Sequence, residues 1–168
     1  MKQIKNIFDF NSKAILVLTA RESQLEQLSY DLAQEEPTAR ICWIRGWKCR
    51  TEADFHNEIA AAIQFPLSYG ENWAAFSDFL GDMRMQSVNP LVLIVARSGQ
   101  LFENESYPVI RDLVEIISGM AEKWSQPEPD FGLAPKVLKL VLQEDYGNLV
   151  ILKEQLSANE CEFEEISV

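Results

Sequence analysis

The sequence predicts an α/β fold with a small, mostly parallel sheet flanked by helices. Two continuous apolar runs of strand length, at 14–19 and 91–95, are typical of strands covered on both faces. Segments with helical spacing lie between the predicted strands, and this alternation favours parallel pairing through helical crossovers. With 168 residues, the chain is long enough for one domain with a substantial core, or for one domain with extensions.

The first predicted strand covers residues 14–19. A helix is expected over 21–34, where Leu25, Leu28 and Leu32 recur at helical spacing ahead of the breaker Pro37. The second predicted strand lies at 40–46. This strand–helix–strand unit favours a parallel pair with a right-handed crossover.

The middle of the chain predicts two helices joined by a turn. Thr51 is a suitable N-cap for a helix that carries Phe55 and Ile59 on one side, and Pro66 ends that run. Gly70 marks the turn, and a second helix is expected to continue to about Met83.

The last part of the chain predicts further strands around one long helix. Residues 91–95 form the clearest buried strand, and Ser106 is expected to cap a long helix that begins near Pro108. Another strand is expected at 137–142, although Pro135 also fits the start of a helix. The apolar run 149–152 is interpreted as an antiparallel partner strand, and the tail at 161–166 either adds a last strand or stays loose.

Charge and cysteine content restrict the partners and the compartment. The net charge is −11, and the last 25 residues hold seven acidic residues and one basic residue. Because phosphate binding requires clustered Lys and Arg, this balance argues against direct binding of nucleic acid or an anionic membrane and favours basic partners. Cys42, Cys49 and Cys161 fit neither a disulfide framework nor a Cys-x-x-Cys metal pair. The first residues lack the apolar run of a signal peptide, and we expect a cytoplasmic protein.

The sequence contains few residues that would serve catalysis. His56 is the single histidine, and its spacing beside Phe55 and Ile59 favours a packing or helix-surface role over a catalytic one. There is no Gly-x-Ser-x-Gly elbow and no Gly-rich phosphate loop, and three separated cysteines with one histidine form no local zinc site. We therefore expect no enzyme activity, no catalytic residues, no metal and no cofactor.

The segment from Tyr69 to Leu80 is the most informative part of the chain. If the helix begins at Glu71, a 3.6-residue turn places Glu71, Asp78 and Asp82 on one stripe, with the small Ala74 and Ala75 beside them. Large apolar side chains occupy the opposite arc, as expected for burial: Trp73, Phe76, Phe79, Leu80 and Met83. Two interpretations fit this pattern: an ordinary solvated face, or a docking face for a positively charged partner.

Residues 40–143 resemble the barstar family, the inhibitors of the ribonuclease barnase. The resemblance is carried by Pro66-x-x-Tyr69-Gly70-Glu71-Asn72, by Ala75-Phe76-x-Asp78-x-Leu80 and by the order of elements around them. It implies that this turn and helix plug a ribonuclease active site, with Asp78 entering the phosphate pocket and Gly70 and Asn72 contacting the enzyme. By position, Glu115 matches a further contacting acid on the long helix.

The resemblance has departures that bear on the partner. Ser68 stands where barstar has a contacting Tyr, Ala74 where it has a second inhibitory Asp, and Ser77 where it has a Trp. Asp82 and Met83 replace a Gly-Trp pair, and Asp82 is hypothesised to supply part of the charge lost at Ala74. These differences favour a cognate toxin other than barnase.

The resemblance also divides the chain and predicts a function. Residues 1–39 are expected to form a strand–helix extension packed on the same sheet, 40–143 a barstar-like domain, and 144–168 an acidic strand or tail. The expected function is an immunity or antitoxin protein, monomeric when free, that inhibits a basic nuclease toxin; the alternative is an interaction module for a basic partner that is not a nuclease. The predicted partner-binding residues are Tyr69, Gly70, Glu71, Asn72, Trp73, Ala74, Ala75, Asp78, Asp82 and Glu115.

Overall fold

The predicted α/β fold is confirmed, and the sheet is parallel throughout. The computed structural model describes residues 4–86 and 88–167. Five strands lie in the order β2-β3-β4-β1-β5, and every neighbouring pair is parallel. The strands are β1 (Ile15–Thr19), β2 (Arg40–Arg45), β3 (Leu91–Ala96), β4 (Leu138–Glu144) and β5 (Glu164–Ser167).

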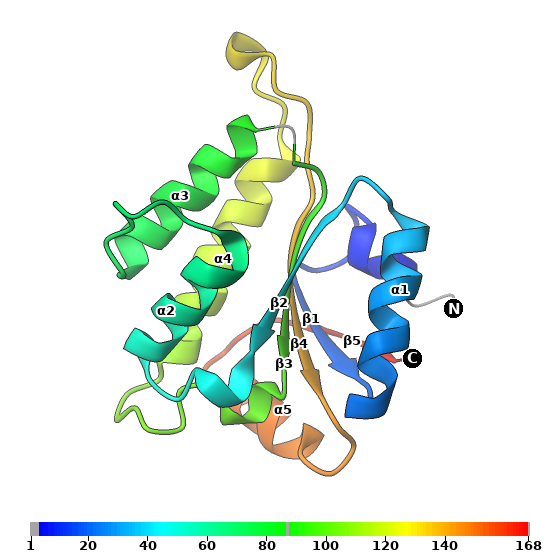
Figure 1. Ribbon diagram of the computed structural model, residues 1–168, viewed down its shortest axis with the longest axis vertical. Coiled ribbons are helices and arrows are strands. Elements are labelled where there is room, and N and C mark those ends of the chain that lie inside the picture. The colour runs from blue at the N-terminus through cyan, green and yellow to red at the C-terminus, as the bar shows by residue number, and fades with distance from the viewer. Residues whose placement is uncertain (1–3, 87, 168) are drawn as a thin grey trace.

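Helices cover both faces of the sheet (Figure 1). On one face lie α2 (Glu52–Ile63), α3 (Trp73–Met85) and α4 (Val109–Ser125), whereas α1 (Leu25–Glu35) and the short 3-10 helix η1 (Ile4–Phe8) cover the other. The helix α5 (Leu149–Ala158) lies near the carboxyl ends of the strands, where it contacts the 3-10 helix η4 (Ser98–Gln100). Three further 3-10 helices are η2 (Glu22–Gln24), η3 (Gly46–Lys48) and η5 (Pro129–Phe131).

The period-two alternation of the strands produces two cores. In β1, Ile15 and Val17 face the α2–α4 layer, whereas Leu16 and Leu18 face α1 and η1. Because both faces are covered, β3 and β4 are buried along their whole length. Burial on both faces explains why β1 and β3 read as continuous apolar runs rather than as alternating patterns, whereas β4 also buries the polar Lys139, Gln143 and Glu144.

Two expectations about the sheet are corrected. The strands β1 and β2 do not pair, because β3 and β4 lie between them; β1 pairs with β4 and β5. The run 149–152 is not an antiparallel strand but the first turn of α5. Only Leu152 and Leu156 of this helix are buried. This four-residue spacing is typical of one face of a helix, so the short apolar run 149–152 does not indicate a strand.

Helix caps are confirmed in one case and corrected in another. Thr51 caps α2 as predicted, since its hydroxyl accepts from the backbone N–H of Asp54 and the Asp54 carboxylate accepts from the N–H of Thr51, each at 3.1 Å. Ser106 does not cap α4, whose N-cap position is Pro108, with no side-chain cap bond. Proline suits this end of a helix because the first backbone N–H groups have no partner within the helix.

The tail adds a strand to the sheet. The strand β5 pairs in parallel with β1, so strands from the front, the middle and the end of the chain lie in one sheet. The division into a barstar-like domain with two extensions stays a prediction. Among the described residues, no helix is long and apolar enough to cross a membrane.

Candidate partner-binding site

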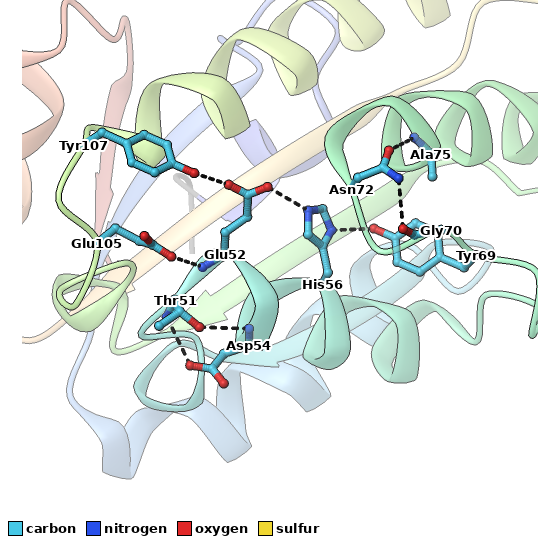
Figure 2. Close-up of polar contacts among 10 residues, drawn as sticks. All are labelled: Thr51, Glu52, Asp54, His56, Tyr69, Gly70, Asn72, Ala75, Glu105 and Tyr107. Atoms are coloured by element: carbon cyan, nitrogen blue, oxygen red, sulfur yellow. Dashed lines mark hydrogen bonds and ion pairs between the residues drawn. The ribbon is translucent and has the colours of Figure 1, made fainter.

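The candidate site consists of a turn, Tyr69–Asn72, here called the docking turn, and the helix α3 that follows it. The side chain of Asn72 shapes the turn: its Oδ1 accepts from the N–H of Ala75 at 3.0 Å, and its Nδ2 donates to the carbonyl of Gly70 at 2.9 Å (Figure 2). Asn72 is therefore the N-cap of α3, and it also ties the helix start back to the turn.

Glu71 does not belong to the helix, which corrects its expected place on one stripe with two aspartates. Its φ is 50°, in the left-handed region, and α3 begins only at Trp73. A helical wheel therefore does not place Glu71 relative to Asp78. Glu71 is an exposed carboxylate of the docking turn.

The helix α3 is amphipathic, as its apolar spacing predicts. Phe76, Leu80 and Met83 are buried, whereas Asp78 and Asp82 are exposed one helical turn apart. Ala74 is exposed and Ala75 half-buried, so small side chains lie beside the carboxylates. We call Asp78 and Asp82 the acidic face of α3.

Aromatic rings of the core pack against the two ends of the docking turn. Tyr69 is buried, and its ring centroid lies 4.7 Å from that of Phe65 and 5.7 Å from that of Phe79. Trp73 packs against Phe55 with ring centroids 5.5 Å apart. Tyr69 and Trp73, which flank the exposed Gly70, Glu71 and Asn72, thus pack against the core.

His56 is the residue at this site whose role the sequence does not reveal. It is fully buried in α2, as a packing histidine would be, but its Nδ1 also lies 2.6 Å from the hydroxyl of Tyr69. Burial lowers the pKa of His56, while the carboxylates of Glu52 and Glu71 act in the opposite direction. A partner 13 residues away has no sequence signal; the four-residue spacing between Glu52 and His56 is the only local hint.

Glu115, the remaining predicted residue, lies on α4. It is exposed and paired with Arg111 at 2.8 Å, and it lines a cavity together with residues 159–162, which lead into β5. The structure thus groups Glu115 with the approach to β5, and its role in partner binding stays a prediction.

Among residues 4–86 and 88–167, no group of three or more His, Cys, Asp or Glu side chains is arranged to hold a metal ion. Cys42, Cys49 and Cys161 are buried free thiols. Burial raises the pKa of Cys49 to about 12, so this thiol is held in its neutral form.

The fold places the chain among the open, all-parallel α/β proteins. Within that class the chain belongs to the barstar family, since residues 39–136 match "Barstar (barnase inhibitor)". The family is one of inhibitors and not of enzymes, and the matched segment includes the docking turn and the whole of α3. No curated protein matches the chain.

Solved structures share the fold. Cdc6p from Pyrobaculum aerophilum has a TM-score of 0.53 and 14% identity over 98% of this chain and 42% of its own. The ORC2 protein of Aeropyrum pernix, solved as ADPNP-ADP complexes, has a TM-score of 0.59 and 10% identity over 99% of this chain and 45% of its own. The chain thus spans less than half the length of these proteins, and at such identities the likeness shows the fold alone.

In this chain, the segment that follows β1, Ala20–Gln24, contains no glycine of the kind that a phosphate-binding loop requires. Gln143 lies at the same edge of the sheet, where its Nε2 donates to the carbonyl of Ala20 and its Oε1 accepts from the N–H of Arg97. The side chain of Gln143, in β4, thus links the ends of β1 and β3.

Proposed function

We propose that the chain is an inhibitor of a basic ribonuclease-type toxin, which it blocks by inserting the docking turn and the acidic face of α3 into the active site. The observation that carries this proposal is the anchored docking turn leading into an exposed acidic helix, inside the segment matched to the barstar family. In a cell that makes such a toxin, the inhibitor would act as an immunity or antitoxin protein.

Exposure and charge support docking through α3. Asp78 and Asp82 are exposed and four residues apart, whereas the opposite side of the helix is fixed in the core by Phe76 and Leu80. Small side chains at Ala74 and Ala75 allow a partner surface to approach closely. The proposed partner groups are Lys and Arg side chains that hold phosphate when the nuclease binds its substrate.

The net charge of −11 supports electrostatic steering of a basic partner. Long-range attraction raises association rates, and salt weakens it because the Debye length is about 10 Å at 0.1 M ionic strength. We therefore expect fast association that slows as the salt concentration rises. In this proposal the free inhibitor is a monomer in the cytoplasm, where its buried free thiols remain reduced.

The test is co-expression of this chain with neighbouring open reading frames, scored as rescue of growth from toxicity. Asp78→Arg is expected to abolish rescue, because it places a cation against the cations of the toxin. The matched control is Glu26→Arg, an equal charge change at an exposed site on α1, across the sheet from α3. Full rescue by Asp78→Arg would overturn the proposed docking face. Capture of a basic partner without nuclease activity would instead favour the interaction-module alternative.

A further inference from the structure

The loop between α4 and β4 projects from the molecule beyond the end of α3, and residues 126–135 of this loop are here called the finger (Figure 1). Two antiparallel backbone hydrogen bonds between Glu128 and Leu133, of 2.9 and 3.0 Å, close the finger, and η5 forms its tip. Gly132 ends η5 with a φ of 65°, in the left-handed region that favours glycine. Three of these ten residues are prolines, which restrict the chain further. The finger is therefore an ordered loop.

Arg84, in the last turn of α3, joins the base of the finger to the helix. It is 2% exposed, and its guanidinium donates to the carboxylate of Glu128 and to the backbone carbonyl of Gln126. In the opposite direction, the Nζ of Lys136 donates to the carbonyl of Arg84, at 2.8 Å, and to that of Gln86. The last carbonyl groups of a helix have no partner within it, so Lys136 also satisfies the end of α3.

The burial of Arg84 indicates that the fold specifies the position of the finger. An ion pair removed from water contributes little to stability, because both groups lose their hydration, and well-packed apolar residues in its place are often at least as stabilising. The Nε of Arg84 is moreover buried without a hydrogen-bond partner among the described residues. The arginine instead adds a fixed geometry, because its planar guanidinium bonds two points of the finger at once.

The tip of the finger exposes an aromatic side chain and an acid. Phe131 is 67% exposed, and Pro129 and Asp130 beside it are exposed as well. The finger contains two acidic residues and no basic residue. A single exposed apolar side chain is ordinary on a protein surface, but this one lies at the end of an ordered loop that a largely buried ion pair fixes. Aromatic side chains that fill a pocket on a partner are typical anchors of protein interfaces.

The finger and the docking turn lie at opposite ends of α3 (Figure 1). The helix has 13 residues, so at a rise of about 1.5 Å per residue it is about 20 Å long. An interface of ordinary size covers about 800 Å² on each partner, which is a patch about 30 Å across. A protein that covers the acidic face of α3 is therefore large enough to reach the finger as well.

We propose that the finger is a second contact for the partner of the docking turn: Phe131 enters a shallow apolar site on the nuclease, outside its active site, and Asp130 pairs with a Lys or Arg side chain beside that site. Arg84 is the positioning residue that keeps the finger at the end of α3. The identity of the partner rests on the proposed function. Because the finger is already ordered in the free chain, its docking costs little conformational entropy.

A contact of this kind adds selectivity. Cations that hold phosphate are expected in any nuclease with the same substrate, so an acidic helix alone discriminates poorly among such enzymes. A site outside the active site is free to differ between them. The finger thus gives the inhibitor a means of selecting its own toxin.

The order of the finger is tested in the free protein by amide hydrogen exchange. The N–H groups of Gly132 and Leu133 form hydrogen bonds of 3.0 Å within the finger and are expected to exchange slowly in the wild type. Arg84→Met is expected to raise both rates at least about tenfold, while the N–H of Ala75, at the start of α3, keeps its rate. Fast exchange of the finger amides in the wild type would overturn the proposal, because a loop without a fixed shape is not a preset contact.

Two further variants separate release of the finger from loss of the fold. Glu128→Gln removes the charge of the carboxylate with little change in shape, and it is expected to raise the same rates by a smaller factor. Arg111→Met, which removes the exposed pair with Glu115 on α4, is the control and should leave the finger unchanged. Wild-type exchange in both Arg84→Met and Glu128→Gln would refute the positioning role of Arg84.

The contact itself is tested by co-expression with the neighbouring open reading frames, with toxin expression raised in steps. Phe131→Ser and Asp130→Lys are each expected to lower the toxin expression that cells tolerate about tenfold. Tyr30→Ser, at an exposed aromatic residue of α1 across the sheet, is the control and should have no effect. Because Arg84 acts through the finger, adding Arg84→Met to Phe131→Ser is expected to cause little further loss.

The outcomes distinguish the second contact from the proposed function. If Asp78→Arg abolishes rescue while both tip variants rescue as well as the wild type at every toxin level, the finger is not a contact and the proposed function stands. Absence of rescue by the wild type would overturn the proposed function and the assignment of this partner to the finger alike. A dimer of the free chain that Phe131→Ser converts to a monomer, measured by light scattering, would assign the tip to a second copy of the chain and contradict the proposal.

Discussion

The side-chain Oδ1 of Asn72 accepts a hydrogen bond from the backbone N–H of Ala75 at 3.0 Å, so a residue of the docking turn is also the N-cap of α3. The same side chain donates to the carbonyl of Gly70. The conformation of the turn and the start of the acidic helix therefore depend on one amide group. A change at Asn72 affects both parts of the candidate site together.

Substitution of Asn72 tests this coupling. Asn72→Ala is expected to lower the free energy of unfolding by about 1 kcal/mol, because an N-cap bond is lost. Asn72→Asp keeps the capping oxygen but not the donor to Gly70, so it should retain most of the stability while still altering the turn. Urea denaturation measures both variants, with Asn57→Ala, an exposed change on α2, as the control. Equal stability of wild type and Asn72→Ala would show that the bond contributes nothing.

Gly46 tests a close backbone approach at the end of β2. A Cβ atom there would lie 2.5 Å from the carbonyl oxygen of Ala96 and 2.8 Å from that of Arg97, and backbone atoms yield little. Gly46→Ala is expected to lower the free energy of unfolding by about 1–3 kcal/mol. Gly119 in α4 is the matched site, because beyond the adjacent backbone of its own helix a Cβ there meets no described heavy atom within 4 Å. Gly119→Ala should raise stability by up to about 1 kcal/mol, and a similar loss at both sites would refute the steric argument.

Most of the fold could be predicted because its signals are local. Continuous apolar runs mark β1 and β3, and Thr51 caps α2. Of the five apolar side chains predicted to face the core from α3, Phe76, Leu80 and Met83 are buried, and Trp73 and Phe79 are half-buried. These features depend on neighbours within a few residues. The family resemblance then identifies the docking turn in the chain; its predicted bounds, 40–143, begin one residue after the matched segment 39–136 and end seven residues after it.

The errors concern features that only the folded chain determines. The order of strands in the sheet depends on pairing between segments far apart in the chain. The residues of β1 therefore do not indicate that it lies between β4 and β5. Leu149–Leu152 has a composition that fits a strand as well as a helical turn, and packing of Leu152 and Leu156 decides in favour of α5. The bond between His56 and Tyr69 joins two elements, and periodicity along one element does not indicate it.

Lys139 gives a prediction about alkaline pH. It is 3% exposed, its Nζ donates to the carbonyls of Ser12 and Lys13 at 2.6 and 3.0 Å, and burial lowers its pKa to about 8. An unfolded lysine has a pKa of about 10.4, so between these values the unfolded state binds more protons. The contribution of Lys139 to the free energy of unfolding therefore rises with pH in this window, by at most about 1.4 kcal/mol per pH unit.

Comparison with Lys139→Met isolates this effect from other groups. Burial raises the pKa of Cys49 to about 12, and such groups lower stability at alkaline pH in both proteins. Urea denaturation at pH 7.5 and 9.5 should show the wild type gaining about 1–2 kcal/mol relative to Lys139→Met. Lys48→Met, at an exposed lysine, should show no such change. A constant difference between the wild type and Lys139→Met would contradict the lowered pKa.

Asp82 gives the last prediction, on partner binding. In the proposed complex it supplies charge that Ala74 lacks, and it lies one helical turn beyond Asp78 on the exposed side of α3. With the toxin found by rescue, Asp78→Ala is expected to weaken affinity at least tenfold, since hydrogen bonds to charged groups are worth about 1.5–3 kcal/mol. Asp82→Ala should weaken it less and reduce the salt dependence of association.

Adding Ala74→Asp to Asp82→Ala should then recover affinity for the toxin, because it returns a carboxylate to the same helix. Unchanged affinity in Asp82→Ala, alongside a strong loss in Asp78→Ala, would mean that Asp82 is a solvated acid and that the partner does not reach the second half of the helix.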